Sequence, residues 1–494
     1  MRRHPWLTAT IVLVAVCAVL FFCLEWRAEQ RWRRYAADAR GHGVKLLLSD
    51  FARPEIPDEQ NFAALPMMRK AFAGPAGESA FTLPDVANSG ADHLPFPKGD
   101  RPPVFGDITK AQEIVWSDWQ KYFQAAGFLT ELSDNPPADV LRALDHYAPQ
   151  FQEWSEWRKR PRCRFPLDFT KGMNIPFSHL STFQRAVKVF ALRMRAHLAV
   201  GDSAAAYVDF QDGLQTYRAL REEPVLISGL VRIANLHVLL AGVGDGLRDR
   251  TWQLAELARI ETDLAAIRVW DDWRLALESE RGYVNSTMES WLRASMRERG
   301  KMVAETFAFG GRNPTQEMEF RFCPRMVFRD NQLRQNQYLD ELLARIDTAH
   351  QTIDIDRPAP SSAEQITDIY ERLHYFLFAT SAGAFGGVEQ RYVQLQTLLD
   401  EARLACALER FRASRGTYPE RLADLAPEYI ATIPTDIYAR APYRYQRLGE
   451  TSFRLYSVGQ NRTDDGGQLV PGVQERKQLD ALWIYAPPAP ATPP

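Results

Sequence analysis

Residues 6–24 form an apolar run that contains no charged side chain. A helix of about 19 residues spans roughly 30 Å, the thickness of the hydrocarbon core of a bilayer. Trp6 and Trp26 stand at its two ends, where aromatic rings favour the membrane–water interface. A cleaved signal peptide is the competing interpretation, but the run is long, and Glu25-Trp26-Arg27 follows it in place of a small-residue cleavage site. The sequence therefore predicts an uncleaved N-terminal transmembrane anchor.

The length of 494 residues exceeds the size at which a single core keeps growing, so we expect two or three domains. A net charge of -2 argues against bulk nucleic-acid binding, which requires a strong basic excess. Changes in composition divide the chain into five predicted parts. These are 1–40, the anchor (about 6–24) and a basic juxtamembrane helix; 41–107, a Pro-rich irregular segment; 108–357, an α-helical body; 363–486, a C-terminal α+β domain; and 487–494, a Pro-rich tail.

In the predicted helical body, apolar residues recur at spacings of three and four. The clearest unit is a hairpin over residues 183–220, in which Gly201 suits the left-handed position that ends one helix and Asp202 caps the next. The hairpin resembles a single tetratricopeptide unit, but no repeat of about 34 residues follows it, so we expect an irregular antiparallel helical domain. The glycine-rich residues 242–246 are predicted to be a loop that ends a helix. Further helices are expected over residues 224–240, 254–281, 331–351 and 363–380.

The C-terminal part combines helical and strand patterns. Apolar residues from Val388 to Cys406 recur at alternating steps of four and three and form one stripe on a helix of about 25 residues, which Gly416 ends. Residues 443–448 and 453–458 alternate polar and apolar side chains around a turn, and residues 482–485 can add a third strand. These patterns predict a long helix laid across a small three-stranded antiparallel sheet.

Four short motifs follow one another in this part of the chain. They are Gly416-x-Tyr418-Pro419, Pro427-x-Tyr429, Pro434-x-Asp436 and Tyr456-Ser457-x-Gly459. Their order resembles the globular domain of the major pseudopilins of bacterial type II secretion. It is closer still to a C-terminal module of large uncharacterised bacterial membrane-anchored proteins, with which the segment 56–63 (Ile-Pro-Asp-Glu-Gln-Asn-Phe-Ala) is also associated. The resemblance covers residues 387–485. The chain lacks a prepilin leader, and its anchor lies far from the module, so we expect a borrowed binding or structural domain rather than a polymerising subunit.

The resemblance also implies a calcium site, because major pseudopilins bind calcium in the loop after the Tyr-Ser-x-Gly strand. Calcium takes six to eight oxygen ligands from carboxylates, amides and carbonyls. The candidate ligands are Asn461, Asp464, Asp465 and Asp480. Asn461 replaces an expected Asp, and Arg462 adds an opposing charge. An Asx-rich turn that needs no cation is therefore the alternative interpretation.

The two ends of the anchor give conflicting signals about orientation. The basic residues of the juxtamembrane helix outnumber those before the anchor, and by charge counting alone the body would stay in the cytoplasm. Pseudopilin domains work outside the cytoplasmic membrane, and on that ground we expect the body beyond it. The predicted location is the bacterial inner membrane, with a single span and a periplasmic body. In that compartment Cys163 and Cys323 could pair as a disulfide, but two separate thiols are the default expectation.

The sequence shows none of the common catalytic motifs: no Gly-x-Ser-x-Gly, no His-Glu-x-x-His, no phosphate loop and no Cys-x-x-Cys. We therefore expect a non-enzymatic, membrane-anchored binding or scaffold protein. Its expected partners are the membrane and at least one protein, without nucleic acid, and calcium is the one candidate cofactor. The alternatives are an envelope-associated hydrolase with an unrecognised carboxylate site and an accessory component of a type II secretion-like system.

Overall fold

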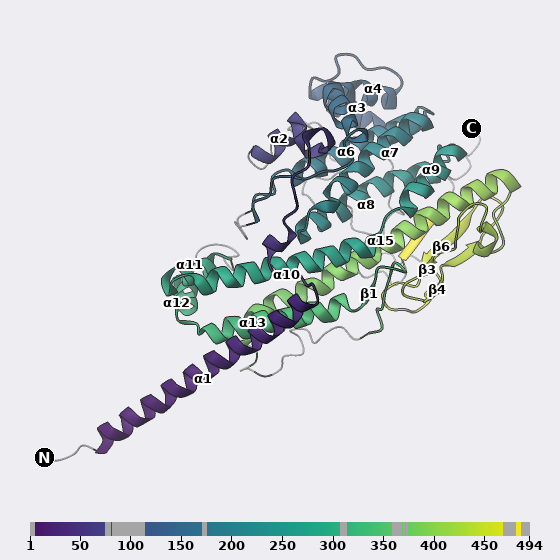
Figure 1. The fold of residues 1–494 in the computed structure, drawn as a ribbon. Helices are drawn as coiled ribbons and strands as arrows, with labels where there is room; N and C mark the ends of the chain where they lie inside the picture. Colours follow the sequence, from purple (N-terminus) through teal and green to yellow (C-terminus); the bar gives the residue numbers. More distant parts are fainter. Residues whose placement is uncertain are drawn as a thin grey trace.

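The computed structural model describes residues 5–74, 81, 114–169, 175–306, 314–357, 368, 371, 374–467 and 481–485. Across these ranges the fold is mainly helical with few short strands, as predicted (Figure 1). The α-helices are α1 (Pro5–Gly41), α2 (Pro66–Ala73), α3 (Trp116–Ala125), α4 (Pro136–Leu144), α5 (Ala148–Ser155), α6 (Leu180–Ala199), α7 (Ser203–Arg218), α8 (Leu226–Arg248), α9 (Leu254–Ala265), α10 (Val269–Arg293), α11 (Met296–Thr306), α12 (Pro314–Phe322), α13 (Arg325–Leu343) and α15 (Phe376–Arg415).

Short 3-10 helices and strands complete the described chain. The 3-10 helices are η1 (Leu48–Phe51), η2 (Asp58–Gln60), η3 (Phe62–Ala64), η4 (Asp145–Tyr147), η5 (Glu156–Arg158), η7 (Ala219–Glu222) and η9 (Leu422–Leu425). The strands are β1 (Ile346–Asp347), β2 (Thr352–Ile353), β3 (Thr435–Asp436), β4 (Ala441–Pro442), β5 (Arg444–Arg447), β6 (Phe453–Ser457) and β7 (Ala481–Tyr485). β1 pairs with β2, β3 with β4, and β6 lies between β5 and β7, all antiparallel.

Helix α1 joins the predicted anchor and the juxtamembrane helix in one continuous element. It is long and apolar enough to span a membrane, and its N-terminal half projects from the body (Figure 1). The C-terminal half packs against α13 and buries Ala28, Trp32, Ala36 and Ala39. Helix α8 also meets the length and composition of a membrane span, but 72% of its apolar window is buried inside the molecule, as in a core helix.

The predicted hairpin is confirmed as α6 and α7. Gly201 has a φ of +84°, the left-handed region that a residue without Cβ enters at low cost. Asp202 caps α7, because its carboxylate accepts a hydrogen bond of 2.9 Å from the backbone N–H of Ala205.

The loop prediction for residues 242–246 is wrong, because these residues lie inside α8. The glycines serve packing instead of ending the helix. A Cβ on Gly242 would lie 2.3 Å from Met194, and one on Gly246 would lie 2.4 Å from Trp252. Glycine therefore lets neighbouring side chains approach the α8 backbone more closely than any other residue would.

Two predicted helices also end differently in the structure. Residues 254–281 form the separate helices α9 and α10, and the helix expected over 331–351 stops at Leu343. Beyond it, the Asp347 carboxylate accepts hydrogen bonds from the backbone N–H groups of Ala349 and His350, which closes the turn between β1 and β2. The linker expected at 358–362 and most of the helix expected over 363–380 lie outside the described residues.

The C-terminal helix and sheet have the predicted arrangement. Helix α15 is 40 residues long, longer than expected, because buried Leu377, Phe378 and Phe385 extend its apolar stripe toward the N-terminus. It ends at Gly416, whose φ is +81°. One side of α15 carries the sheet, and α8, α9 and α13 of the body pack against it as well (Figure 1). A single hydrophobic core therefore runs from α6 through α15 to β6.

Candidate functional site

Two regions of the described chain have the geometry of functional sites. The first is the contact between α1 and the body, which we call the anchor clamp: Glu29, Arg31, Tyr35, Arg329, Asp330 and Asp340. Three contacts join its two sides: Arg329 pairs with Glu29 at 2.7 Å, Arg31 with Asp330 at 2.7 Å, and the Tyr35 hydroxyl donates to Asp340 at 2.7 Å. All three connect α1 to α13, so α1 is fixed to the body by charge as well as by packing.

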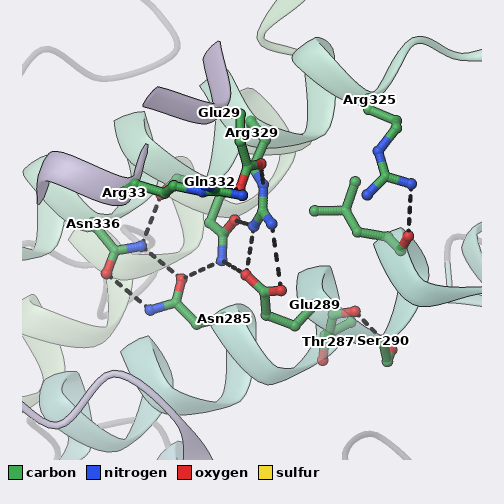
Figure 2. Close-up of polar contacts among 11 residues, drawn as sticks. Glu29, Arg33, Asn285, Thr287, Glu289, Ser290, Arg325, Arg329, Gln332 and Asn336 are labelled. Atoms are coloured by element: carbon green, nitrogen blue, oxygen red, sulfur yellow. Dashed lines mark hydrogen bonds and ion pairs between the residues drawn. The ribbon is translucent and has the colours of Figure 1, made fainter. Parts of the chain in front are cut away.

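Figure 2 shows how the clamp continues into α10. Arg329 also pairs with Glu289 and donates to the side-chain oxygen of Gln332. Gln332 in turn donates to Asn285 and Glu289, and the Asn285 and Asn336 amides exchange hydrogen bonds of 3.0 and 2.7 Å. Three of these side chains, Asn285, Gln332 and Asn336, have an exposed fraction of zero. A connected and satisfied polar network of this kind specifies one arrangement of the helices, because any other would leave buried polar groups unpaired.

The second region is a pocket of about 740 Å³ on the N-terminal side of the body. Its walls are formed by the segment from Phe51 to Ala73, the loop from Cys163 to Phe169, and residues 222–224. Asn61 joins the first two: its side-chain oxygen accepts from the backbone N–H of Arg164 at 2.9 Å, and its amide donates to the Arg164 carbonyl at 3.0 Å. The segment from Asp58 to Ala64 forms two 3-10 turns, and the Asn61 side chain caps the second.

Three arginines converge on one carboxylate at this pocket. Arg164, Arg162 and Arg53 lie 2.7, 3.2 and 3.4 Å from the same oxygen of Glu222. Burial acts to raise the pKa of Glu222, but the hydrogen bonds from Arg162 and Arg164 outweigh it, and the pKa is lowered. Glu222 is therefore an ionised anchor for the arginines and has the wrong pKa for a general acid.

Behind the pocket wall, His179 and Ser228 share the carboxylate of Glu223. The His179 Nε2 lies 2.9 Å from one Glu223 oxygen, and the Ser228 hydroxyl donates to the other. The Glu223 carboxylate lies between the Ser228 hydroxyl and the His179 imidazole, so His179 is not placed to activate Ser228 as a nucleophile. Burial, with a smaller contribution from Glu223, raises the pKa of the Cys163 thiol well above its ordinary value, and the reactive thiolate is disfavoured. The pocket has apolar walls and fixed arginines, which is the chemistry of a binding site.

The two cysteines of the possible disulfide are free thiols in the structure, as in the default expectation. Cys163 is buried in the aromatic core around Trp154 and Phe183, and Cys323 packs beside Phe328 at the start of α13. The two loops belong to different hydrophobic clusters, and the structure does not bring their sulfurs together.

The predicted calcium ligands Asn461, Asp464 and Asp465 share one loop, and Asp480 lies outside the described residues. Both oxygens of Asp464 have protein partners: Arg444 donates to one at 2.8 Å, and the Tyr456 hydroxyl donates to the other at 2.7 Å. The Asn461 amide donates to Asp465 at 2.8 Å, and its oxygen accepts from the Thr463 backbone N–H. Within the described part of the loop the geometry is that of an Asx turn.

The motifs of the C-terminal module join the sheet to α15. The buried carboxylate of Asp436 accepts from the Ser457 hydroxyl at 2.9 Å and from the backbone N–H groups of Tyr438 and Val458 at 3.0 and 3.1 Å. This ties Pro434-x-Asp436 to Tyr456-Ser457-x-Gly459. The Tyr418 hydroxyl of the first motif donates to Glu409 on α15. Three of the four motifs therefore have a structural role in this module.

Two further acids lie buried in the same region of α15. Burial raises the pKa of Asp400 to about 6, and it raises that of Glu401 well above the ordinary value, with Asp436 and Asp400 adding to the rise. Neither residue lines the pocket described above. The two carboxylates with raised pKa values therefore lie outside this pocket.

Sequence reasoning missed the anchor clamp and the pocket. The clamp had one readable signal, since Ala28, Trp32, Ala36 and Ala39 follow one another at helical spacing on the segment that also carries the charges. For the pocket, the segment 56–63 was singled out as a motif and forms part of the wall, but the loop that faces it lies about a hundred residues further along the chain. Comparison with protein-family models, curated proteins and solved structures finds no match to this chain.

Proposed function

We propose that this chain is a membrane-anchored binding or scaffold protein with its body outside the cytoplasm. The observation that carries the proposal is the division of α1 into two halves. The residues from Trp6 to Leu24 are exposed and apolar, whereas the residues after Glu25 are locked to the body through the anchor clamp. Exposed apolar surface of this size requires a bilayer or a partner, and the clamp transmits the position of the bilayer to the whole body.

The binding part of the proposal rests on the pocket. Its apolar wall includes Phe51, Phe72 and Phe165. Its charged lining combines three arginines with five carboxylates: Arg53, Arg69, Arg164, Glu55, Asp58, Asp168, Glu222 and Glu223. We propose a ligand with an apolar body, either as a free molecule or as a segment of a partner protein.

The C-terminal module is, on this proposal, a pseudopilin-like domain used for binding or support. The long helix against a three-stranded antiparallel sheet supports this view. Since α8, α9 and α13 also pack on α15, the helix is committed to this molecule, which favours the scaffold function over polymerisation.

Two experiments test the proposal. Protease added to intact spheroplasts should digest the body; protection that ends only on lysis would place the body in the cytoplasm and refute the location. For the pocket, a photoreactive amino acid at Ile56, which lines the cavity, should form an adduct in cells. The same group at Leu132, which is exposed elsewhere on the body, is the control. Equal adduct yields at both positions would refute the pocket as a specific site.

A further inference from the structure

Helices α11 and α12 form a hairpin at the end of the body from which α1 emerges (Figure 1). They pack closely because of Gly300, where a Cβ would lie 2.5 Å from the Glu317 carbonyl oxygen. The Phe320 ring of α12 stacks on Phe376 of α15, with 5.5 Å between ring centroids. The hairpin is therefore a fixed part of the body.

The outer face of α12 exposes two large apolar side chains beside Thr315 and Glu319. Met318 and Phe322 precede and follow Phe320 by two residues, about 200° around the helix, so they lie opposite the face that packs on the body. Their exposed fractions are 54% and 64%. Met296, at the start of α11, is 51% exposed. Large apolar side chains gathered on one end of a molecule indicate a contact surface.

The contacts of the anchor clamp show which part of α1 lies beside this surface. The contacts run from Glu29–Arg329 to Tyr35–Asp340, so α1 and α13 advance in the same direction. One turn earlier on both helices, Arg325 stands at the level of Glu25, where the apolar run of α1 ends. Phe322 precedes Arg325 by three residues. The C-terminal end of α12 therefore lies at the level of the membrane–water interface if α1 spans the bilayer.

Charge interactions agree with this placement. Burial raises the pKa of Cys323 to about 11, and the charge of Glu25 contributes to the rise, so the loop after α12 lies near the end of the apolar run. The exposed charges of the hairpin are mixed: Arg297 and Lys301 are basic, and Glu298, Glu305 and Glu319 are acidic. The attraction to a bilayer would therefore come from the apolar side chains and depend little on anionic lipid.

We propose that the α11–α12 hairpin is a second membrane contact, in which Met318 and Phe322 enter the interfacial layer of the bilayer that α1 crosses. The proposal rests on α1 being a transmembrane anchor. With two contacts, the body has a fixed tilt against the membrane and cannot rotate freely about α1. The pocket and the C-terminal sheet are then presented in one orientation.

The test uses the full chain in phosphatidylcholine nanodiscs, with a spin label at a cysteine introduced by Phe322→Cys. Cys17, Cys23 and Cys323 are first replaced by serine, and the buried Cys163 and Cys406 are left in place. Accessibility of the label to oxygen, which partitions into lipid, is compared with accessibility to a water-soluble nickel chelate. A label at Leu254→Cys, which is 47% exposed on α9 away from α12, is the matched control (Figure 1).

We expect oxygen accessibility to exceed nickel accessibility at position 322 and the reverse at position 254. Adding phosphatidylglycerol should leave the ratio at 322 unchanged. A label at 322 more accessible to nickel, or shielded from both reagents as in a contact with a second copy, would overturn the proposal. A third label at Val16→Cys separates the two claims: if it too lies in water, the anchor itself fails.

Discussion

Replacing Arg329 by methionine would show how strongly the body holds α1. The Arg329 side chain is 10% exposed and contacts Glu29, Glu289 and Gln332. Methionine keeps much of the volume, so the substitution removes the charge and its hydrogen bonds. Removing one partner of a buried ion pair costs about 3–5 kcal/mol. Because Glu29 and Glu289 remain 29% and 19% exposed, water offsets part of this loss, and we expect the lower limit, about 3 kcal/mol.

The assay is hydrogen exchange of the full chain in nanodiscs, followed by mass spectrometry. If α1 undocks locally, a loss of about 3 kcal/mol corresponds to a roughly 100-fold faster exchange of the amides after Glu25. Arg33→Ala is the control: Arg33 pairs with the same Glu29, but it is 67% exposed and lies on the same helix. The Arg33–Glu29 pair contributes about 0.5 kcal/mol or less to the docking of α1, so its loss should change the exchange rate roughly twofold. Equal exchange in both variants would refute the clamp.

Three further predictions concern stability. Gly246→Ala should lower the free energy of unfolding by about 1–3 kcal/mol, because its Cβ would overlap Trp252; Gly386→Ala, with open space around the Cβ, should not lower it, and thermal melts of both variants decide this. Since burial raises the pKa of Asp400 to about 6 in the folded state, its contribution to stability should fall as the pH rises from about 4 to about 6; Asp400→Asn should reduce this slope in urea titrations, and an unchanged slope would contradict the assignment. Because Asp464 is already paired with Arg444, millimolar calcium should leave the melting temperature unchanged, and a clear rise would favour the calcium interpretation.

The elements that the sequence predicted correctly depend on local chemistry. Gly201 and Asp202 end and start their helices through bonds within a few residues, and the β5–β6 hairpin follows from alternation and a turn. The run from Trp6 to Leu24 is recognisable because a bilayer imposes its own length. In each case the residues that determine the structure lie next to one another in the chain.

The features that escaped prediction depend on distant partners. Gly242 and Gly246 look like helix breakers in sequence, but Met194 and Trp252 occupy the space that a side chain would take, and packing keeps the helix intact. The clamp joins residues about 300 positions apart, such as Glu29 and Arg329. In the segment predicted as a basic juxtamembrane helix, Arg31 and Glu29 pair with Asp330 and Arg329 of the body. Local patterns carry no information about such partners.

The most direct test of the account is the intact mass of the protein recovered from membranes washed with alkaline carbonate. We expect the protein to stay in the washed membranes with its apolar segment attached, because α1 is continuous from the anchor into the clamp. A mature chain that begins after Leu24 and leaves the membrane in the wash would contradict the anchor and the proposals that depend on it.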